Sequence, residues 1–597
     1  MTSTRVVLLV AAVCLLGVVG IATAGAGDAA PSALETQTAT MVTGETSPEV
    51  GTTGVSQSLA DTHVGECAAT PQGEDPDGGT DSVIGWVDGY WYNDTLDIDG
   101  PTIEEDELDS FVARTAARVE AFRCHAFEEV PPTQILTRDE YRQTIEPRFD
   151  EIPADDWRFE DARLATLLVA GQEVDARELQ TAVQTAFPAA FYNTEEEFMG
   201  FITDDPDTIE INQVTLAHEL THALQDQQFD LERIFDEPTN DQFIAALAIA
   251  EGDATTVDTM YEENCEHGIW ADECIIPPPG DDPDIPNWGL ILNQLAAYHT
   301  PLVAETAETE GFGGVDALLE DYPDSMVEAI YPDRYGEFER ADITIPDRSS
   351  GDWERLVTAD EDGGEQEAYD IIGQHGLTAI LAAPSFETGG VVNVIDPAEF
   401  QQPHAGGFLT YSVTETSGWQ ADRLYGYTND AGDNASVWKL AWEDTDEAER
   451  FADAYEELID YRNGALADGY ENVFTFEDAD EYDMAVGLEH DGDRVWIVTA
   501  PTVDDLTAVH EDIELRTADD DPENGDAENG DAENGDADET DDEEADDEVD
   551  DGVGDVADEG EDEDGAALGL VHAAVGLVAV IALALVLSVF PRRGQRR

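Results

Sequence analysis

One uninterrupted helical segment constrains the fold of this chain more than any other stretch. Residues 212–229 (NQVTLAHELTHALQDQQF) carry apolar side chains at helical spacing without Gly or Pro, so we expect a helix that Asn212 caps. The segment contains His218, Glu219 and His222. Residues four apart share a helix face, so both imidazoles can reach one metal ion, with the glutamate beside its open coordination position. The alternative is an amphipathic helix whose two histidines are merely half-buried.

A tetrahedral catalytic zinc needs a third protein ligand. A third histidine in the same segment is excluded, because Gln225 and Gln228 occupy the glycine and histidine positions of that pattern. Glu251 can instead supply a carboxylate from a second helix, because it follows an apolar helical run that begins at Phe243. We expect Gly252 to allow close approach of the two helices. The alternative for Glu251 is an exposed acid in a chain rich in acids.

The two segments together resemble gluzincin-type zinc metallopeptidases. More narrowly, they are similar to uncharacterised bacterial and archaeal proteins with an HExTHALQDQ box and a downstream EGDA. The stretches HELTHALQDQQFDL and AIAEGDAT carry this resemblance, which covers roughly residues 110–335. It implies a Zn²⁺ site formed by His218, His222 and Glu251. It also implies that Glu219 is the general base in hydrolysis of a protein or peptide substrate.

The same resemblance indicates residues around the ligands. An acid that orients a ligand histidine is expected near Asp253 and Thr255, although Thr255 stands where gluzincins usually carry an aspartate. Asp226, one turn after His222, is another candidate for this role, with an ordinary helix-surface charge as the alternative. An oxyanion donor is expected among four aromatic residues, each of which can equally be a packed or surface side chain: Tyr298, His299, Tyr331 and His375.

The charge of the chain indicates the environment in which it works. Asp and Glu number 138 against 25 Lys and Arg, which gives a net charge of −113, and Lys439 is the only lysine. This composition resembles haloarchaeal secreted proteins, whose acidic surfaces stay hydrated and soluble in high salt. It argues against binding to nucleic acid. A polyanion that binds cations or basic substrates is the alternative, but the acidic excess runs along the entire chain.

Both ends of the chain carry long apolar segments. Residues 1–24 read as an export signal cleaved after Ala24, with an uncleaved anchor as the alternative. Residues 566–590 form an apolar run in which His572 is the only ionisable residue, and this run is long enough to cross a bilayer; a basic tail, 591–597, follows. Positive residues stay on the cytoplasmic side, so we expect a single-pass membrane protein whose bulk is extracellular.

Two segments between the apolar ends and the middle of the chain are expected to be flexible. Residues 25–79 are rich in Thr, Ser, Gly and Ala. Residues 516–565 contain three ENGDA repeats and an acidic run that cannot bury a core. Glycosylation sequons begin at Asn93 and Asn434, consistent with an extracellular location.

Four cysteines lie outside the export signal, and an even number predicts two disulfides in an exported protein. Cys265 with Cys274 closes a short loop after the second metal-binding helix, and Cys67 with Cys124 pins the N-terminal segment. A cysteine zinc site is the alternative, but the chain contains no C-x-x-C.

The middle of the chain is expected to be α+β, with two domains. Residues 80–345 are expected to form a mainly helical zincin-like metallopeptidase domain, and residues 346–515 a smaller α+β accessory domain that supports the site, selects substrate or inhibits. The first should contain helices over 107–127, 176–185 and 288–308 and strands over 189–193 and 198–203. The second should contain strands over 423–428 and 435–442, a hairpin over 485–499, and helices over 445–461 and 503–514.

The sequence therefore favours a membrane-anchored extracellular zinc metallopeptidase. A catalytically inactive HExxH protein with a binding or structural role in the cell envelope is the first alternative, and the intact Glu219 speaks against it. A zinc hydrolase of a non-peptide bond is the second, and the sequence does not distinguish it from a peptidase. The oligomeric state is left open.

Overall fold

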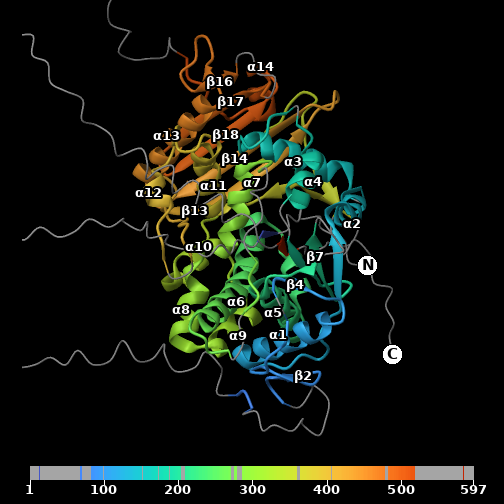
Figure 1. The fold of residues 1–597 in the computed structure, drawn as a ribbon. Coiled ribbons are helices and arrows are strands. Elements are labelled where there is room, and N and C mark those ends of the chain that lie inside the picture. Colours follow the sequence, from blue (N-terminus) through green and yellow to red (C-terminus); the bar gives the residue numbers. More distant parts are fainter. Residues whose placement is uncertain are drawn as a thin grey trace, which may run out of the picture.

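The chain folds as an α+β protein in a computed structural model (Figure 1). The structure describes residues 67–69, 83–98 and 100–517, apart from short stretches at 151, 173, 187–188, 204–208, 271–273, 278–284, 360–363, 405–406 and 477–481. It also gives two paired strands near the ends, β1 (Ala12–Val13) and β19 (Ala582–Leu583). The expected export signal, flexible segments, C-terminal apolar span and basic tail lie almost wholly outside the described residues. Among the described residues, no helix combines the length and apolar character needed to span a membrane.

Helices dominate the part of the chain between residues 108 and 334. They are α1 (Leu108–Arg123), α2 (Arg138–Asp150), α3 (Ala154–Thr166), α4 (Ala176–Ala186), α5 (Gln213–Phe229), η2 (Leu231–Asp236), α6 (Asn240–Glu266), α7 (Trp288–Leu295), η3 (Ala296–Tyr298), α8 (Pro301–Glu310), α9 (Phe312–Glu320), α10 (Met326–Ile330) and η4 (Pro332–Arg334). Helices α5 and α6 pack against each other; α1 lies against α5, and α8 and α10 lie against α6 (Figure 1).

The helix expected over residues 288–308 is wrong as a single element. The chain leaves the helical conformation at His299 and Thr300, and α8 starts at Pro301. Proline has no N–H to donate and disfavours helical geometry in the residue before it, but it fits the first turn of a new helix. Two helices separated by a 3-10 turn therefore replace the expected one.

Three small sheets lie among these helices. Strand β2 (Trp86–Val87) pairs with β3 (Tyr90–Trp91), and β4 (Thr102–Ile103) pairs with β8 (Ile209–Glu210). The third sheet has the order β5 (Thr133–Thr137), β7 (Phe198–Thr203), β6 (Ala190–Asn193), with β5 parallel and β6 antiparallel to β7. Strand β6 is thus an edge strand, and it packs against α5.

An eight-stranded antiparallel sheet fills the C-terminal part of the described chain (Figure 1, orange and yellow). Its order is β12 (Tyr369–Asp370), β13 (Trp419–Thr428), β14 (Asn434–Trp442), β18 (Arg494–Ala500), β17 (Ala485–Asp491), β16 (Val473–Phe476), β15 (Gly464–Leu466), and β9 (Glu354–Arg355) also pairs with β13. A separate hairpin joins β10 (Val357–Ala359) to β11 (Glu365–Glu367). The helices of this part are α11 (Gly373–Glu387), α12 (Pro397–Phe400), α13 (Thr445–Tyr461) and α14 (Val503–Val509). Helix α14 is shorter than the helix expected over 503–514.

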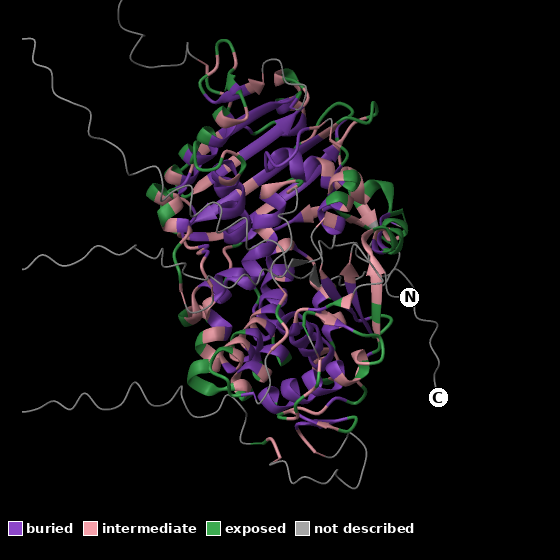
Figure 2. Ribbon diagram, in the orientation of Figure 1, coloured by how far each residue is buried: buried purple, intermediate pink, exposed green. Residues whose placement is uncertain are grey.

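The large sheet is buried on both faces. Successive side chains of a strand point to opposite faces, and each face packs against a different set of helices. Trp438 of β14 packs against Phe451 and Tyr455 of α13, whereas the preceding Val437 belongs to a second cluster with Leu506 of α14. The α13 face of the sheet shares one core with α1, α5, α6 and α11. The buried core therefore continues across residue 345, where we expected a domain boundary (Figure 2).

Candidate metal centre

The expected ligands meet between α5 and α6. His218 and His222 lie one turn apart on α5, and Glu251 faces them from α6; one possible ligand atom from each lies within 4.8 Å of the others. The Nε2 atoms of His218 and His222 are 3.3 and 3.5 Å from Glu251 Oε2. All three side chains are fully buried. Two helices packed through apolar faces thus place three potential ligands together in the interior.

Asp258 sets the orientation of the first histidine. Its Oδ2 lies 2.6 Å from Nδ1 of His218. A carboxylate oxygen accepts, so Nδ1 is the donor and Nε2 directs its lone pair towards Glu251. Burial raises the pKa of Asp258, and the charge and hydrogen bond of His218 oppose this rise. Seven residues, or two helical turns, separate Asp258 from Glu251, so both lie on the same face of α6.

Gln225 sets the orientation of the second histidine. Its Nε2 donates to the Ala250 carbonyl at 2.9 Å and to Asp253 Oδ2 at 2.7 Å. Both partners can only accept, so the amide nitrogen faces α6 and Oε1 faces His222 Nδ1, at 2.9 Å. Nδ1 of His222 is therefore also a donor, and its Nε2 carries a lone pair.

The ligand atoms fit a divalent cation. With both Nδ1 atoms protonated, two imidazole lone pairs and the Glu251 carboxylate face one another, an arrangement that a bound cation would stabilise. Ligands about 2.0–2.1 Å from a tetrahedral zinc lie about 3.3–3.4 Å apart. The two histidine–glutamate distances, 3.3 and 3.5 Å, agree with this spacing, and the possible ligand atoms of all three residues lie within 4.8 Å of one another.

Glu219 lies beside these ligands in the interior. Its side chain is fully buried, and no side chain of the described residues forms a hydrogen bond with its carboxylate oxygens. Burial raises its pKa well above the ordinary value; the charge of His218 and the backbone N–H of Tyr192, in the edge strand β6, oppose the rise, whereas Glu251 increases it. A carboxyl group in this environment holds a proton more tightly than one in water.

Other residues expected around the ligands have different partners. Asp253 binds Gln225 and reaches a ligand histidine only through it. Asp226 accepts from the Tyr192 hydroxyl at 3.0 Å and from the Leu231 N–H at 3.2 Å. Thr255 is half-buried on α6. The acid that orients a ligand histidine is therefore Asp258, which we did not expect.

The role expected for Gly252 is wrong. A Cβ atom at this position would meet Val303 at 2.8 Å, so the glycine allows close approach of α8, rather than of α5, to α6.

The four candidates for an oxyanion donor fall into two groups. Gln374 donates to the hydroxyl of Tyr331, and Asn240 lies 3.1 Å from Nε2 of His375; both contacts lie at the start of α11. Tyr298 and His299 are buried at the end of η3, which packs on α6. The His299 ring contacts Phe408, and burial lowers its pKa to about 3, so it is neutral. Both groups adjoin α6, but His375 contacts its first residue, Asn240, eleven residues before Glu251.

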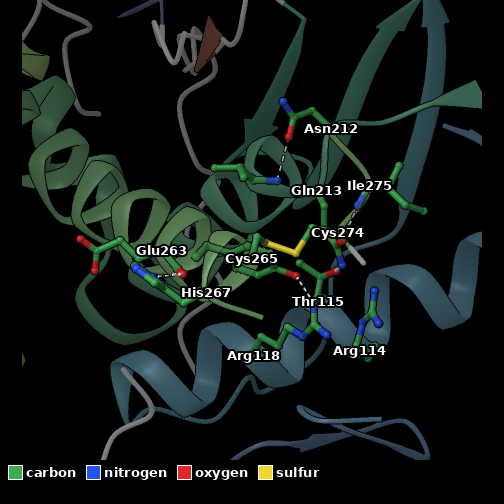
Figure 3. Close-up of a disulfide and its surroundings, with 12 residues drawn as sticks. Arg114, Thr115, Arg118, Asn212, Gln213, Glu263, Cys265, His267, Cys274 and Ile275 are labelled. Atoms are coloured by element: carbon green, nitrogen blue, oxygen red, sulfur yellow. Dashed lines mark hydrogen bonds between the residues drawn. A yellow bond between two sulfur atoms is a disulfide. The ribbon is translucent and has the colours of Figure 1, made fainter. Parts of the chain in front are cut away.

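A disulfide helps to connect the two helices that carry the candidate ligands (Figure 3). Cys265 in the last turn of α6 is joined to Cys274, and the next residue, Ile275, forms two hydrogen bonds with Gln213 in the first turn of α5: Gln213 N–H to Ile275 O at 2.9 Å, and Ile275 N–H to Gln213 Oε1 at 3.1 Å. The end of one metal-site helix is thereby tied to the start of the other. The second disulfide joins Cys67 to Cys124, so the structure contains both pairs that we expected.

The potential glycosylation sites lie away from the interior. Asn93 is exposed and Asn434, at the start of β14, is half-buried.

Fold and site together define an α+β protein with a buried centre of two histidines and one glutamate. A family model described as Domain of unknown function (DUF8575) matches residues 355–510. This segment contains the large sheet and α11 to α14, whereas the candidate ligands precede it in the chain. Comparison with curated proteins found no match, and neither did comparison with solved structures.

Proposed function

We propose that this protein is a membrane-anchored extracellular zinc metallopeptidase of gluzincin type. The observation that carries the proposal is the arrangement of His218, His222 and Glu251, whose lone pairs converge at the spacing of zinc ligands with Glu219 beside them. In this proposal the helical region up to residue 345 is zincin-like, the following part is accessory, and the C-terminal apolar segment is the anchor.

Glu219 has the position and environment of a proton carrier. A zinc ion bound by the three ligands would supply Lewis-acid activation of the water and of the scissile carbonyl. A Glu219 carboxylate oxygen takes a proton from the attacking water, whose oxygen bonds to the carbonyl carbon. As the C–N bond breaks, the same oxygen passes that proton to the leaving amine. The raised pKa of this buried side chain favours holding the proton between the two steps.

Strand β6 supplies a place for an extended peptide. It is an edge strand in the three-stranded sheet, packs against α5, and contains the Tyr192 N–H that acts on Glu219. An extended peptide adds to an exposed sheet edge through backbone hydrogen bonds. All four residues of β6 are buried, so a peptide would have to displace what covers this edge. We therefore propose a protein or peptide substrate that lies along β6.

The decisive experiment compares the full chain with its Glu219→Gln variant in high salt. We expect about one zinc per chain in both proteins by elemental analysis, and cleavage of casein or a peptide library by the first protein alone. Zinc binding without cleavage by the unchanged chain would contradict peptidase action and favour an envelope binding protein or a hydrolase of another bond. Absence of zinc would contradict every metal-dependent function.

The third ligand is tested separately by Glu251→Ala. Loss of a charged ligand should remove zinc from the purified chain, as measured by elemental analysis after dialysis. Glu266→Ala is the matched control, because it removes an exposed acid from the same helix. Full zinc affinity in Glu251→Ala would show that another residue is the third ligand.

A further inference from the structure

A chain of buried polar contacts runs outward from His222. We define the His222 relay as Gln225, Asp253, Arg123 and Asp316. Gln225 joins His222 to Asp253. Nε of Arg123 lies 3.0 Å from Asp253, and its Nη2 lies 2.7 Å from Oδ1 of Asp316 on α9.

The relay ends near the surface and is anchored there. Oδ2 of Asp316 lies 2.8 Å from Nε2 of His125, which is partly exposed. Arg123 also lies over the ring of Phe312, with its Cζ 4.5 Å from the ring centroid. Arg123 and Asp253 are almost completely buried, with exposed fractions of 2% and 0%. A buried ion pair of this kind needs a specific geometry, because either charge alone is costly in the interior.

The donor and acceptor groups of the relay determine how the Gln225 amide is oriented. A glutamine amide can present either its oxygen or its nitrogen to a neighbour, so Gln225 alone does not determine which atom faces His222. Asp253 removes this freedom, since it can only accept and draws the amide nitrogen to itself. Burial raises the pKa of Asp253, and the opposite charge of Arg123, whose Nε lies 3.0 Å away, opposes this rise. Each residue of the relay therefore limits the orientation of the next one, from Asp316 to the His222 imidazole.

We propose that the His222 relay consists of positioning residues that keep the His222 proton on Nδ1 and so leave Nε2 available to a metal ion. The consequence for metal binding rests on the proposed function. The consequence for the imidazole does not, because the tautomer exists in the metal-free chain.

The test uses Asp253→Asn in the full chain. Asparagine has nearly the same shape, but it can donate to Gln225 and thereby allow the amide to turn, while the Ala250 carbonyl holds the original orientation less strongly on its own. In metal-free protein labelled with ¹⁵N-histidine, we expect the His222 signals of the unchanged chain to show the proton on Nδ1. In Asp253→Asn a substantial fraction should carry it on Nε2. The His222 signals are assigned by their loss in His222→Gln.

Zinc affinity is the second measurement on the same proteins. Competition with a chelator should show a loss of about 10- to 100-fold in Asp253→Asn, the range found when groups behind a ligand are removed. Asp316 lies two side chains further from His222 than Asp253 does, so Asp316→Asn should lower the zinc affinity by only a few-fold. Glu320→Gln is the matched control, because it removes an exposed acid from the same helix α9, and it should leave zinc affinity unchanged.

The outcomes distinguish this inference from the proposed function. A folded Asp253→Asn chain with the original tautomer and full zinc affinity overturns the relay. If that variant does not fold, Asp316→Asn decides, and zinc affinity equal to that of the control overturns the relay. A relay that behaves as expected in a chain that cleaves no peptide would contradict peptidase action alone. If the unchanged chain binds no zinc, the tautomer of His222 in the variants still decides.

Discussion

Two buried acids in this chain serve as acceptors for backbone N–H groups of distant segments. The two carboxylate oxygens of Glu120, on α1, accept from Gly85 and Phe127 at 2.9 Å each. Asp422, on β13, accepts from the Ile372 and Gly373 N–H groups at the start of α11. Each acid thereby fixes a distant segment to a regular element. A residue type that is abundant on the surface is therefore also structural in the interior.

Replacement of Glu120 by glutamine tests this at a single residue. Burial raises the pKa of Glu120 from 4.5 to about 7. The folded chain thus binds the proton more tightly than the unfolded chain, so the contribution of Glu120 to stability is fully present below about pH 4.5 and is lost as the pH rises to about 7. We expect the Tm of the unchanged chain to fall relative to that of Glu120→Gln over this range, followed by circular dichroism.

The comparison needs a control for the general effect of pH on so acidic a protein. Glu105→Gln removes an exposed acid close to the start of α1, and its Tm should follow that of the unchanged chain at every pH. A constant difference between the unchanged chain and Glu120→Gln from pH 4.5 to 7 would contradict a raised pKa.

At the candidate metal centre, the relation between residues close in sequence was predictable, whereas the contacts between helices were not. His218, Glu219 and His222 lie within one helical turn, so their relation follows from helix geometry alone. Glu251 could be proposed because it follows an apolar run. The partnership of Asp258 with His218 depends on the register between α5 and α6, which no local pattern contains. In a chain with 138 acids, the seven-residue spacing from Glu251 was not distinctive.

At the scale of elements, the centre depends on how α5 and α6 are held together. Their middles meet through the ligands and through Gln225, and one pair of ends is tied by the Cys265–Cys274 disulfide and the Gln213–Ile275 hydrogen bonds. Gln213 also donates to the Thr115 hydroxyl on α1 at 3.3 Å (Figure 3). The disulfide therefore limits the position of the first turn of α5, and with it the turn that carries His218.

Removal of this disulfide should loosen the centre without deleting any ligand. A cross-link with a sequence separation of 9 is expected to stabilise the folded chain by roughly 2–3 kcal/mol. The double variant Cys265→Ser, Cys274→Ser should therefore have a lower Tm by calorimetry and a weaker zinc affinity by chelator competition. Zinc affinity equal to that of the unchanged chain would show that helix packing alone positions the ligands.

The elements themselves were predictable where a helix or strand has a continuous local pattern. Helix α13 coincides with the expected range 445–461, and β14 and β17 start within a residue of expectation. The error at residues 288–308 arose because apolar periodicity continues through the break before Pro301. Helix α11 was not expected: it is buried along nearly its whole length, so it lacks the alternation of apolar and polar faces that marks a surface helix.

At the scale of the whole molecule, the metal-site helices are supported by the segment that follows residue 345. The Asn240 N–H at the start of α6 donates to Asp370 Oδ1 at 2.8 Å, and the Asp241 N–H donates to the Ile371 carbonyl at 3.0 Å. Gly373 has a φ of 78° and packs against the Asp241 side chain, where a Cβ atom would collide. The segment matched by the family model is therefore in direct contact with the helix that carries Glu251.

A chain that ends at residue 345 should consequently fail to form the metal centre. It would expose the apolar surfaces that α7 and α6 bury against α11 and would leave the start of α6 without its partners. We expect low solubility, binding of a hydrophobic dye, and no specific zinc binding. A chain that ends at residue 517 should retain the contacts described above, apart from the pairing of β1 with β19. A soluble, zinc-binding chain 1–345 would demonstrate two independent domains.

The position of these supports along the chain also sets the order in which the centre can mature. A ribosome completes the three candidate ligands by residue 251, but Asp370, Ile371 and Gly373 emerge only about 120 residues later, and the strands that close the shared core extend to residue 500. Between these two stages of translation the candidate ligands are therefore present without the framework that aligns them. If the proposed metal ion binds, an ion captured early would meet an incomplete and strongly acidic polypeptide. Selective binding is therefore expected at the end of synthesis, when nearly the whole polypeptide is available to fold.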